Sequence, residues 1–160
     1  MNYLGFKKDE LEEVVESLNI LLSNYQLYYQ NLRNFHWNIK GENFFELHAQ
    51  FELLYDDARV KIDEIAERVL TLRHTPISKL SEYMSHASIT EANVTSDDRE
   101  MVNVVLNNHK ELVKNLRNVI TNAGKAKDEG TVDMAGSFLA NLEKKSWMLD
   151  AWYSLAATPA

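Results

Sequence analysis

Apolar residues recur every three or four positions along most of the chain, which is the spacing of one face of an α-helix. The first such stripe ends at Lys40 and Gly41, a pair typical of a helix break. The second stripe continues to Leu72, and Pro76 is expected to stop that helix. The two stripes comprise Leu11, Val15, Leu18, Leu22, Tyr25, Tyr29, Leu32 and His36, then Phe44, Leu47, Phe51, Leu54, Ala58, Ile62, Ile65, Val69 and Leu72. They predict two long helices joined by a short turn.

The second half of the chain repeats this pattern after a long connection. Residues 77–95 carry no sustained stripe, although a short helix is expected near Leu80 to His86. The run Thr95-Ser96-Asp97-Asp98 combines cap residues with first-turn acids and predicts the start of a third helix, which ends near Gly124. The segment "GKAKDEGTVD" predicts a turn, and a fourth helix is expected from about Val132 to Trp152. Four long helices with one long crossover predict an all-α, ferritin-like four-helix bundle that forms a single domain over residues 1–160.

Composition narrows the function classes. The chain has no cysteine, which excludes disulfides, thiolate metal sites and cysteine nucleophiles. No apolar run approaches the roughly 18 residues that a membrane span needs, and the acidic, amphipathic start does not resemble a secretory signal. We therefore expect a cytoplasmic protein without a membrane partner. The net charge of −7, from 24 acidic and 17 basic side chains, suits cations better than nucleic-acid phosphates.

The side chains that could bind a metal do not follow the usual pattern of ferritin-like bundles. Such bundles build a di-iron centre from Glu and Glu-x-x-His pairs, and this chain contains no Glu-x-x-His. The available ligands are His36 at the end of the first helix, His48 early in the second, and the carboxylates Asp63 and Glu67. The carboxylates are four positions apart, so both project from one helix face. Imidazole with carboxylate suits iron, manganese or zinc.

Helix geometry separates these ligands into two halves. His48 and Asp63 are 15 residues apart, which corresponds to about 22 Å along a helix. No single ion bridges that distance, because metal–ligand bonds are about 2 Å long. The same 15 steps leave Asp63 about 60° round the helix from His48, so both lie on one face. Two copies packed antiparallel about a two-fold axis would bring His48 of one subunit to Asp63 and Glu67 of the other, giving two equal sites.

Simpler explanations exist for the same residues. A histidine on an apolar stripe is usually a core residue with a satisfied hydrogen bond. An acidic pair at this spacing is usually a solvated face, which Arg59 or Arg68 would neutralise. His74, His86 and His109 are expected on the connection or the helix surface, without a ligand role.

At these residues the sequence resembles the Dps proteins, or mini-ferritins. The stretch "FHWNIKGENFFELHAQFELLYDDARVKIDEIAERV" is similar to the signature of that family, with His-Trp, then Gly and Leu-His, then Asp-x-Ile-Ala-Glu-Arg. The segment "KKSWMLDAW" is similar to its last helix. The resemblance spans nearly the whole chain. It implies a ferritin-like bundle that assembles as a hollow dodecamer, with ferroxidase centres at two-fold dimer interfaces.

The resemblance also implies a reaction. His36 and His48 of one subunit join Asp63 and Glu67 of its mate, and the site holds two iron ions. Iron(II) is oxidised, typically by hydrogen peroxide, and Fe(III) is stored as a mineral inside the shell, which protects against oxidative damage. The anionic carboxylates favour Fe(III), with Glu67 as the expected bridge, whereas the neutral histidines hold the second iron more loosely. Glu52, one turn past His48, matches a position that is usually acidic in the family, where it contributes either to iron binding or to structure.

Two further roles follow from the resemblance, each with a simpler alternative. Acids near the start of the last helix line iron-entry pores in such shells, and Asp128, Glu129 and Asp133 lie there in this chain; the alternative is a solvated turn. Trp37 lies beside the site, where it either intercepts stray oxidising equivalents or packs as an aromatic residue at the dimer contact.

The chain departs from the family at its ends and at one helix terminus. Members that bind DNA often carry a flexible tail rich in Lys and Arg, whereas "MNYLGFKK" has two lysines and "AWYSLAATPA" has no basic residue. Direct DNA binding is therefore not expected at physiological salt, and a nucleoid-binding protein with secondary iron activity is the alternative function. Arg73 also stands after Leu72, where the family commonly has Gly.

Overall fold

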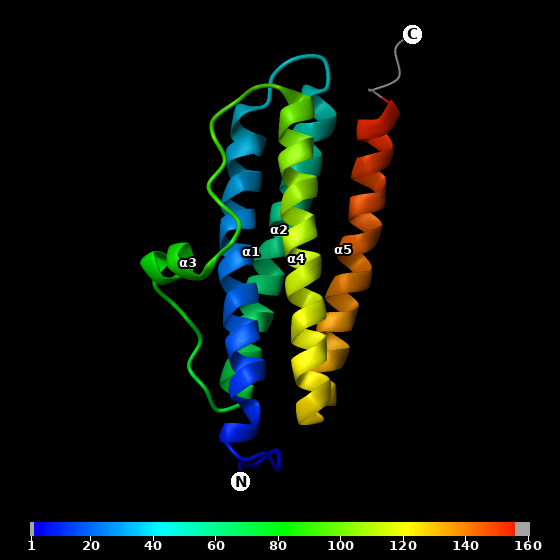
Figure 1. Cartoon of the computed structure of the whole chain (residues 1–160). Helices are drawn as coiled ribbons and strands as arrows, with labels where there is room; N and C mark the ends of the chain where they lie inside the picture. The colour runs from blue at the N-terminus through cyan, green and yellow to red at the C-terminus, as the bar shows by residue number, and fades with distance from the viewer. Residues whose placement is uncertain (1, 156–160) are drawn as a thin grey trace.

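The computed structural model describes residues 2–155 of this chain. Its elements are the short 3-10 helix η1 (Asp9–Leu11) and the α-helices α1 (Glu12–Asn38), α2 (Phe44–Thr71), α3 (Leu80–His86), α4 (Asp98–Ala126) and α5 (Glu129–Leu155). Figure 1 shows α1, α2, α4 and α5 side by side as a bundle. The connection from α2 to α4 returns along the outside of α1 and carries α3. The predicted all-α, ferritin-like bundle with one crossover and a short extra helix is confirmed.

The apolar stripes of the four long helices meet in one core. The rings of Phe35 and Phe51 join α1 to α2, with centroids 5.8 Å apart. Burying one Leu or Phe side chain contributes about 1.5–3 kcal/mol, so the stripes hold the helices together. Residues with no more than 1% of their surface exposed include Leu18, Leu22, Tyr25, Leu32, Phe35, Phe51, Leu54, Ile65, Leu72, Met101, Val105, Leu112, Leu116 and Val119. The stripes that the sequence predicted for α1, α2 and α4 are thus the faces that pack.

The end of α2 is set by Arg73 and not by Pro76. Arg73 has φ 67°, a left-handed conformation that costs an ordinary L-residue about 1–2 kcal/mol. It allows the His74 N–H to donate to the Val69 carbonyl at 3.1 Å, which satisfies a carbonyl of the last turn. The Arg73 guanidinium lies 4.6 Å from the centre of the Tyr3 ring. The helix therefore stops before Pro76, and a cation–π contact offsets part of the cost of an arginine at this position.

The turn between α4 and α5 is shorter than predicted. Lys127 adopts φ 58°, and the Asp128 N–H donates to the Ala123 carbonyl at 2.8 Å. The same left-handed ending thus terminates α4, and α5 begins at Glu129 instead of near Val132. At the other end of α4, the predicted start is confirmed, with Asp97 as the cap residue.

Asparagines on α1 bind the crossover to the bundle. The Asn31 side-chain amide donates to the Thr90 carbonyl at 3.0 Å and accepts from the Ala92 N–H at 2.8 Å. These are the two bonds that the backbone of an adjacent β-strand would make. The side-chain Oδ1 of Asn24 accepts from the Ile89 N–H at 2.8 Å. Further bonds run from the Ile77 N–H to Asn19 and from Asn34 to the Ala92 carbonyl. The backbone of an irregular segment is therefore satisfied by side chains of one helix.

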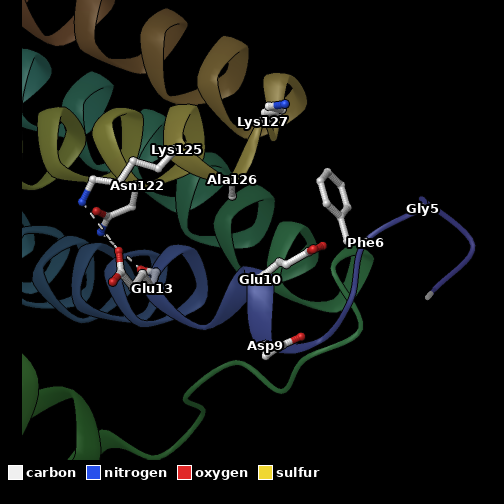
Figure 2. Close-up of a pocket in the computed structure, with 9 residues that line it drawn as sticks. All are labelled: Gly5, Phe6, Asp9, Glu10, Glu13, Asn122, Lys125, Ala126 and Lys127. Atoms are coloured by element: carbon white, nitrogen blue, oxygen red, sulfur yellow. Dashed lines mark hydrogen bonds and ion pairs between the residues drawn. The ribbon is translucent and has the colours of Figure 1, made fainter.

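The described N-terminal residues fold against the ends of α2 and α4. The Tyr3 hydroxyl donates to the Thr71 carbonyl at 2.6 Å. Figure 2 shows the pocket beside this segment, which is lined by Phe6 and by charged side chains of both signs. Its volume is about 550 Å³. The Nζ atom of Lys125 lies 3.7 Å from a carboxylate oxygen of Glu13, and both residues line this pocket. The segment that precedes η1 is thus packed on the bundle.

Candidate metal centre

The structure brings His36 and His48 into direct contact. Gly41, at φ 101°, lies in the turn that reverses the chain between α1 and α2, and the two rings stack with centroids 3.7 Å apart. The Nδ1 atom of His36 lies 2.7 Å from the His48 carbonyl oxygen, and that of His48 lies 2.8 Å from the His36 carbonyl oxygen. Because a carbonyl oxygen can only accept, each Nδ1 carries a proton and donates it. This reciprocal pair fixes both rings in one orientation.

The hydrogen bonds determine which nitrogen can bind a metal. A neutral imidazole that is protonated on Nδ1 has its lone pair on Nε2. In metal-binding histidines, the ring nitrogen that does not bind the metal usually donates a hydrogen bond, often to a backbone carbonyl. This bond fixes the tautomer and raises the basicity of the nitrogen that binds the metal. His36 and His48 are therefore satisfied histidines, as the simpler explanation requires, and both retain a ligand atom.

Aromatic side chains enclose the histidine pair. The Phe44 ring stacks on His48 at 4.9 Å, and Tyr55 meets His36 edge-on at 5.3 Å. His36 is 8% exposed, and His48 is half-buried. Burial raises the pKa of Tyr55, and the negative charges of Glu52 and Asp56 raise it further, so this phenol stays neutral. The Phe44 and Tyr55 rings therefore limit the motion of both imidazole rings.

Asp63 and Glu67 lie on one exposed face of α2, at a distance from the histidines. Within the described chain, neither carboxylate forms an ion pair. Arg68, expected as a neutralising partner, instead donates to Asp128 at 2.5 Å and to Thr131 at 2.9 Å. The two acids are thus solvated and available as ligands.

The four predicted ligands form two halves within one chain. In the part of the chain that the structure describes, no three His, Asp or Glu side chains gather as a metal-binding group. About 22 Å of α2 separates His48 from Asp63, as the sequence spacing predicted. Glu52, one turn after His48, is exposed on the same helix. One chain therefore supplies a histidine half and a carboxylate half at different points along α2.

The three acids predicted to line a pore have different environments. Asp128 is 2% exposed and is the cap of α5: it accepts from the Thr131 N–H at 3.2 Å and from Arg68. Glu129 and Asp133 are exposed near the same end of α5. A carboxylate that is buried and neutralised by arginine adds little to a cation-attracting surface, so any such surface here depends on Glu129 and Asp133.

The prediction that His109 lies on the helix surface is wrong. His109 is 1% exposed in the core, where its ring contacts Tyr28 edge-on at 5.3 Å. Burial, with a smaller effect from the Lys145 charge, lowers the pKa of His109 to about 3. The sequence did contain a signal, because His109 falls between Val105 and Leu112 on the apolar stripe of α4.

Three comparisons place the chain among known proteins. A family model described as Ferritin-like domain matches residues 15–157. The DNA protection during starvation protein of Brevibacillus brevis is 42% identical over 146 residues, which are 91% of this chain and 98% of that protein. Among the described residues, each helix is too short or too polar to cross a membrane.

Solved structures agree with this result. The Dps protein of Vibrio cholerae O1 matches with a TM-score of 0.92 and 39% identity, covering 95% of this chain and 96% of that chain; it is described as a ferritin-like diiron-carboxylate protein. A Listeria innocua Dps, in which two histidines twelve positions apart are replaced by glycine, matches with a TM-score of 0.85 and 28% identity, covering 89% and 95% of the two chains. The chain belongs to the Dps family of ferritin-like proteins.

Proposed function

We propose that this protein oxidises Fe(II) at sites shared between two subunits and stores the Fe(III) product inside a hollow dodecamer. The observation that carries the proposal is the reciprocal hydrogen-bonded pair of His36 and His48, which directs both Nδ1 protons to backbone carbonyls and leaves both Nε2 atoms as ligands. Family membership supports iron storage and protection of DNA as the general role. The Listeria innocua variant changes two histidines with the spacing of His36 and His48, which supports the same pair.

The histidine half needs a carboxylate half from another chain. Asp63 and Glu67 are exposed and free of ion pairs within the described chain, yet they lie about 22 Å along α2 from His48. An antiparallel α2–α2 contact about a two-fold axis would join the halves twice, since an isologous interface repeats each contact. His36 and His48 would then act with Asp63 and Glu67 of the partner subunit, with Glu52 as an additional acid.

The donor set suits the chemistry. Anionic Asp63 and Glu67 stabilise Fe(III) relative to Fe(II), and the neutral histidines bind a second ion more weakly. Two iron ions in one site can give hydrogen peroxide two electrons together: two Fe(II), one H₂O₂ and two protons yield two Fe(III) and two waters. This route avoids the hydroxyl radical that a single electron would produce. Iron is the substrate and the stored cargo of this reaction.

Removal of iron and peroxide would protect DNA without contact between protein and DNA. The chain carries a net charge of −7, and Tyr3 holds the described N-terminal residues on the bundle through its bond to Thr71. We expect no mobility shift of duplex DNA at about 150 mM salt, because salt at this concentration screens weak contacts between the protein and DNA phosphates. Tight binding under those conditions would favour the nucleoid-binding alternative.

Mixing two inactive variants tests the shared site. One variant carries His36→Gly and His48→Gly, and the other carries Asp63→Ala and Glu67→Ala. Each alone should oxidise Fe(II) no faster than buffer. The two variants are dissociated and reassembled together at a one-to-one ratio, so that subunits of both kinds meet in one dimer. One of the two sites of a mixed dimer keeps all four ligands, so random reassembly should restore about a quarter of wild-type activity.

The controls separate ligand loss from damage to the fold. Glu64→Ala removes an exposed carboxylate adjacent to Asp63 on α2 and should retain wild-type activity. All variants should elute as twelve-subunit assemblies. Activity that stays at background in the mixture would contradict a shared site, and wild-type activity in the Asp63→Ala/Glu67→Ala variant would contradict the ligand assignment.

A further inference from the structure

A chain of hydrogen bonds crosses the core away from the proposed iron site. The Tyr28 hydroxyl lies 2.8 Å from Nε2 of His109, and Nδ1 of His109 lies 2.7 Å from the Ser146 hydroxyl oxygen. These residues belong to α1, α4 and α5, and the aromatic pair is almost fully buried, with Tyr28 3% exposed. The proposed iron chemistry does not use this chain.

The direction of every proton in the chain can be assigned. The Ser146 hydroxyl donates to the Leu142 carbonyl at 2.7 Å, so its oxygen accepts from Nδ1–H of His109. Nε2 of His109 then holds a lone pair and accepts from the Tyr28 hydroxyl. Burial raises the pKa of Tyr28, so its phenol keeps this proton while it remains reduced. The result is a buried phenol bonded to a neutral base.

This arrangement is chemically different from that of the neighbouring Tyr25. The two tyrosine rings meet edge-on at 6.0 Å in the same core, and Tyr25 is 1% exposed. The Tyr25 hydroxyl has no hydrogen-bond partner among the described residues. A phenol that loses an electron becomes a strong acid, and oxidation is far easier where a base can take the proton at once. Tyr28 has such a base, and Tyr25 does not.

Aromatic contacts lead from the histidine pair towards Tyr28. Tyr55 touches His36 edge-on, and Tyr29 touches Tyr55 with centroids 5.9 Å apart. Tyr29 is the covalent neighbour of Tyr28, and eight residues of α1, a rise of about 12 Å, separate Tyr28 from His36. The ring contacts thus extend from His36 to Tyr29, and an electron would cover the remaining step from Tyr28 to Tyr29 along the backbone of α1.

We propose that Tyr28 and His109 form a proton-coupled electron donor that removes one-electron oxidants produced at the iron site. This proposal rests on the proposed function for its oxidant, the hydroxyl radical that a single Fe(II) forms from peroxide. The radical takes an electron and the phenolic proton from Tyr55 and becomes water, and Tyr55 takes a proton back from water when it is reduced. Tyr28 reduces that ring, and its phenolic proton moves to Nε2 of His109. Fe(II) then returns an electron to the Tyr28 radical, and the proton returns from His109.

Freeze-quench electron paramagnetic resonance tests this assignment in the assembled protein. Apo-protein is mixed with sub-stoichiometric Fe(II) and excess hydrogen peroxide, and ring-deuterated tyrosine identifies a tyrosyl signal. We expect the signal in wild type and its loss in Tyr28→Phe, which removes one hydroxyl. His109→Gln keeps a hydrogen-bond acceptor but not a base, and should lose the signal as well.

Tyr25→Phe is the matched control, because it removes a buried tyrosine hydroxyl that has no base beside it. This variant should keep the wild-type signal. Circular dichroism and assembly size report whether each variant folds, and if Tyr28→Phe does not assemble, His109→Gln and Tyr25→Phe decide the question. A signal that survives in Tyr28→Phe or His109→Gln, or one lost in Tyr25→Phe, overturns the proposal. So does an absent signal in wild type while Fe(II) is being oxidised.

A second arm distinguishes failure of this proposal from failure of the proposed function. Photogenerated tris(bipyridine)ruthenium(III) oxidises the metal-free protein by one electron without any iron chemistry. If the protein does not accelerate Fe(II) oxidation but this oxidant produces the radical on Tyr28, the iron function fails and the Tyr28–His109 donor stands. If neither treatment produces a Tyr28 radical, the donor is rejected whatever the iron kinetics show.

Discussion

Gly41, in the turn between α1 and α2, leads to a prediction that relates the backbone conformation of this turn to the geometry of the proposed site. Gly41 adopts φ 101°, and a Cβ at this position would meet no atom within 4 Å. The effect of Gly41→Ala is therefore conformational and not a steric clash. An L-residue forced into positive φ costs about 1–2 kcal/mol, and we expect the variant to lose that much stability. The strain falls on the turn that stacks His36 on His48.

The same substitution in α5 is expected to have the opposite effect. Gly136 lies within the helix at an ordinary φ, and a Cβ there also meets nothing within 4 Å. Gly136→Ala should therefore stabilise the protein by about 0.5–1 kcal/mol, because alanine loses less backbone entropy in a helix. The two variants make the same chemical change, so the difference between their stabilities, about 1.5–3 kcal/mol, reports backbone conformation.

Thermal unfolding at one fixed subunit concentration measures this difference, because assembly makes the midpoint depend on concentration. We expect a lower midpoint for Gly41→Ala and a higher one for Gly136→Ala, with about 2–4 °C for each kcal/mol. Fe(II) oxidation should slow in Gly41→Ala and not in Gly136→Ala. Equal midpoints for the two variants would refute the backbone argument. A destabilised Gly41→Ala with unchanged oxidation would show that the proposed site tolerates a shifted histidine pair.

Three further predictions concern helix ends and the core. Lys127→Gly should raise the unfolding midpoint, because glycine relieves the left-handed strain. Arg73→Gly should change the midpoint less, because it also removes the contact of Arg73 with Tyr3. Equal gains for the two variants would show that this contact contributes nothing. Asp128→Asn keeps the α5 cap but leaves the Arg68 charge without its carboxylate partner, so it should lower the free energy of unfolding in urea by about 3 kcal/mol. Glu129→Gln, at an exposed position, should lower it by less than about 0.5 kcal/mol. The unfolded chain protonates His109 near its ordinary pKa of 6.5, whereas the folded protein does so at about 3. The unfolded state thus binds more protons between these values, and the free energy of unfolding falls as the pH drops through that window. A His109→Gln variant should lose this part of the pH dependence, and an unchanged profile would contradict the assignment.

The helical stripes could be predicted because each helix of the bundle presents one apolar face to a single core. Leu18, Phe51 and Leu112 are buried for that reason, and periodicity alone identifies them. The lengths of α1 and α2 followed from the same pattern. The distance between His48 and Asp63 was also predictable, because a helix has a fixed rise per residue.

Contacts between distant segments were not predictable from periodicity. The bonds from Asn31 to Thr90 and Ala92 depend on where the crossover returns along α1, and asparagines at helical spacing look like an ordinary polar face. Asp128 was grouped with Glu129 and Asp133 because all three are acidic and close in sequence. Its burial depends on Arg68, which comes from another helix 60 residues earlier. Such pairings become visible when the helices are packed together.

The division of the proposed site has a consequence for control of its chemistry. The histidine half is already ordered within one subunit, by bonds from His36 and His48 to each other's backbone, whereas Asp63 and Glu67 remain exposed and separate from it. An unassembled subunit with this geometry has neutral ligands in one place and anionic ligands in another. It could bind iron weakly, but it could not hold two ions for a two-electron reaction. Oxidation would begin when α2 of one subunit meets α2 of the next, and this contact is also the first step in building the shell that would receive the Fe(III). The mixed-variant experiment therefore tests, in one measurement, the identity of the ligands and whether catalysis requires the contact between two subunits.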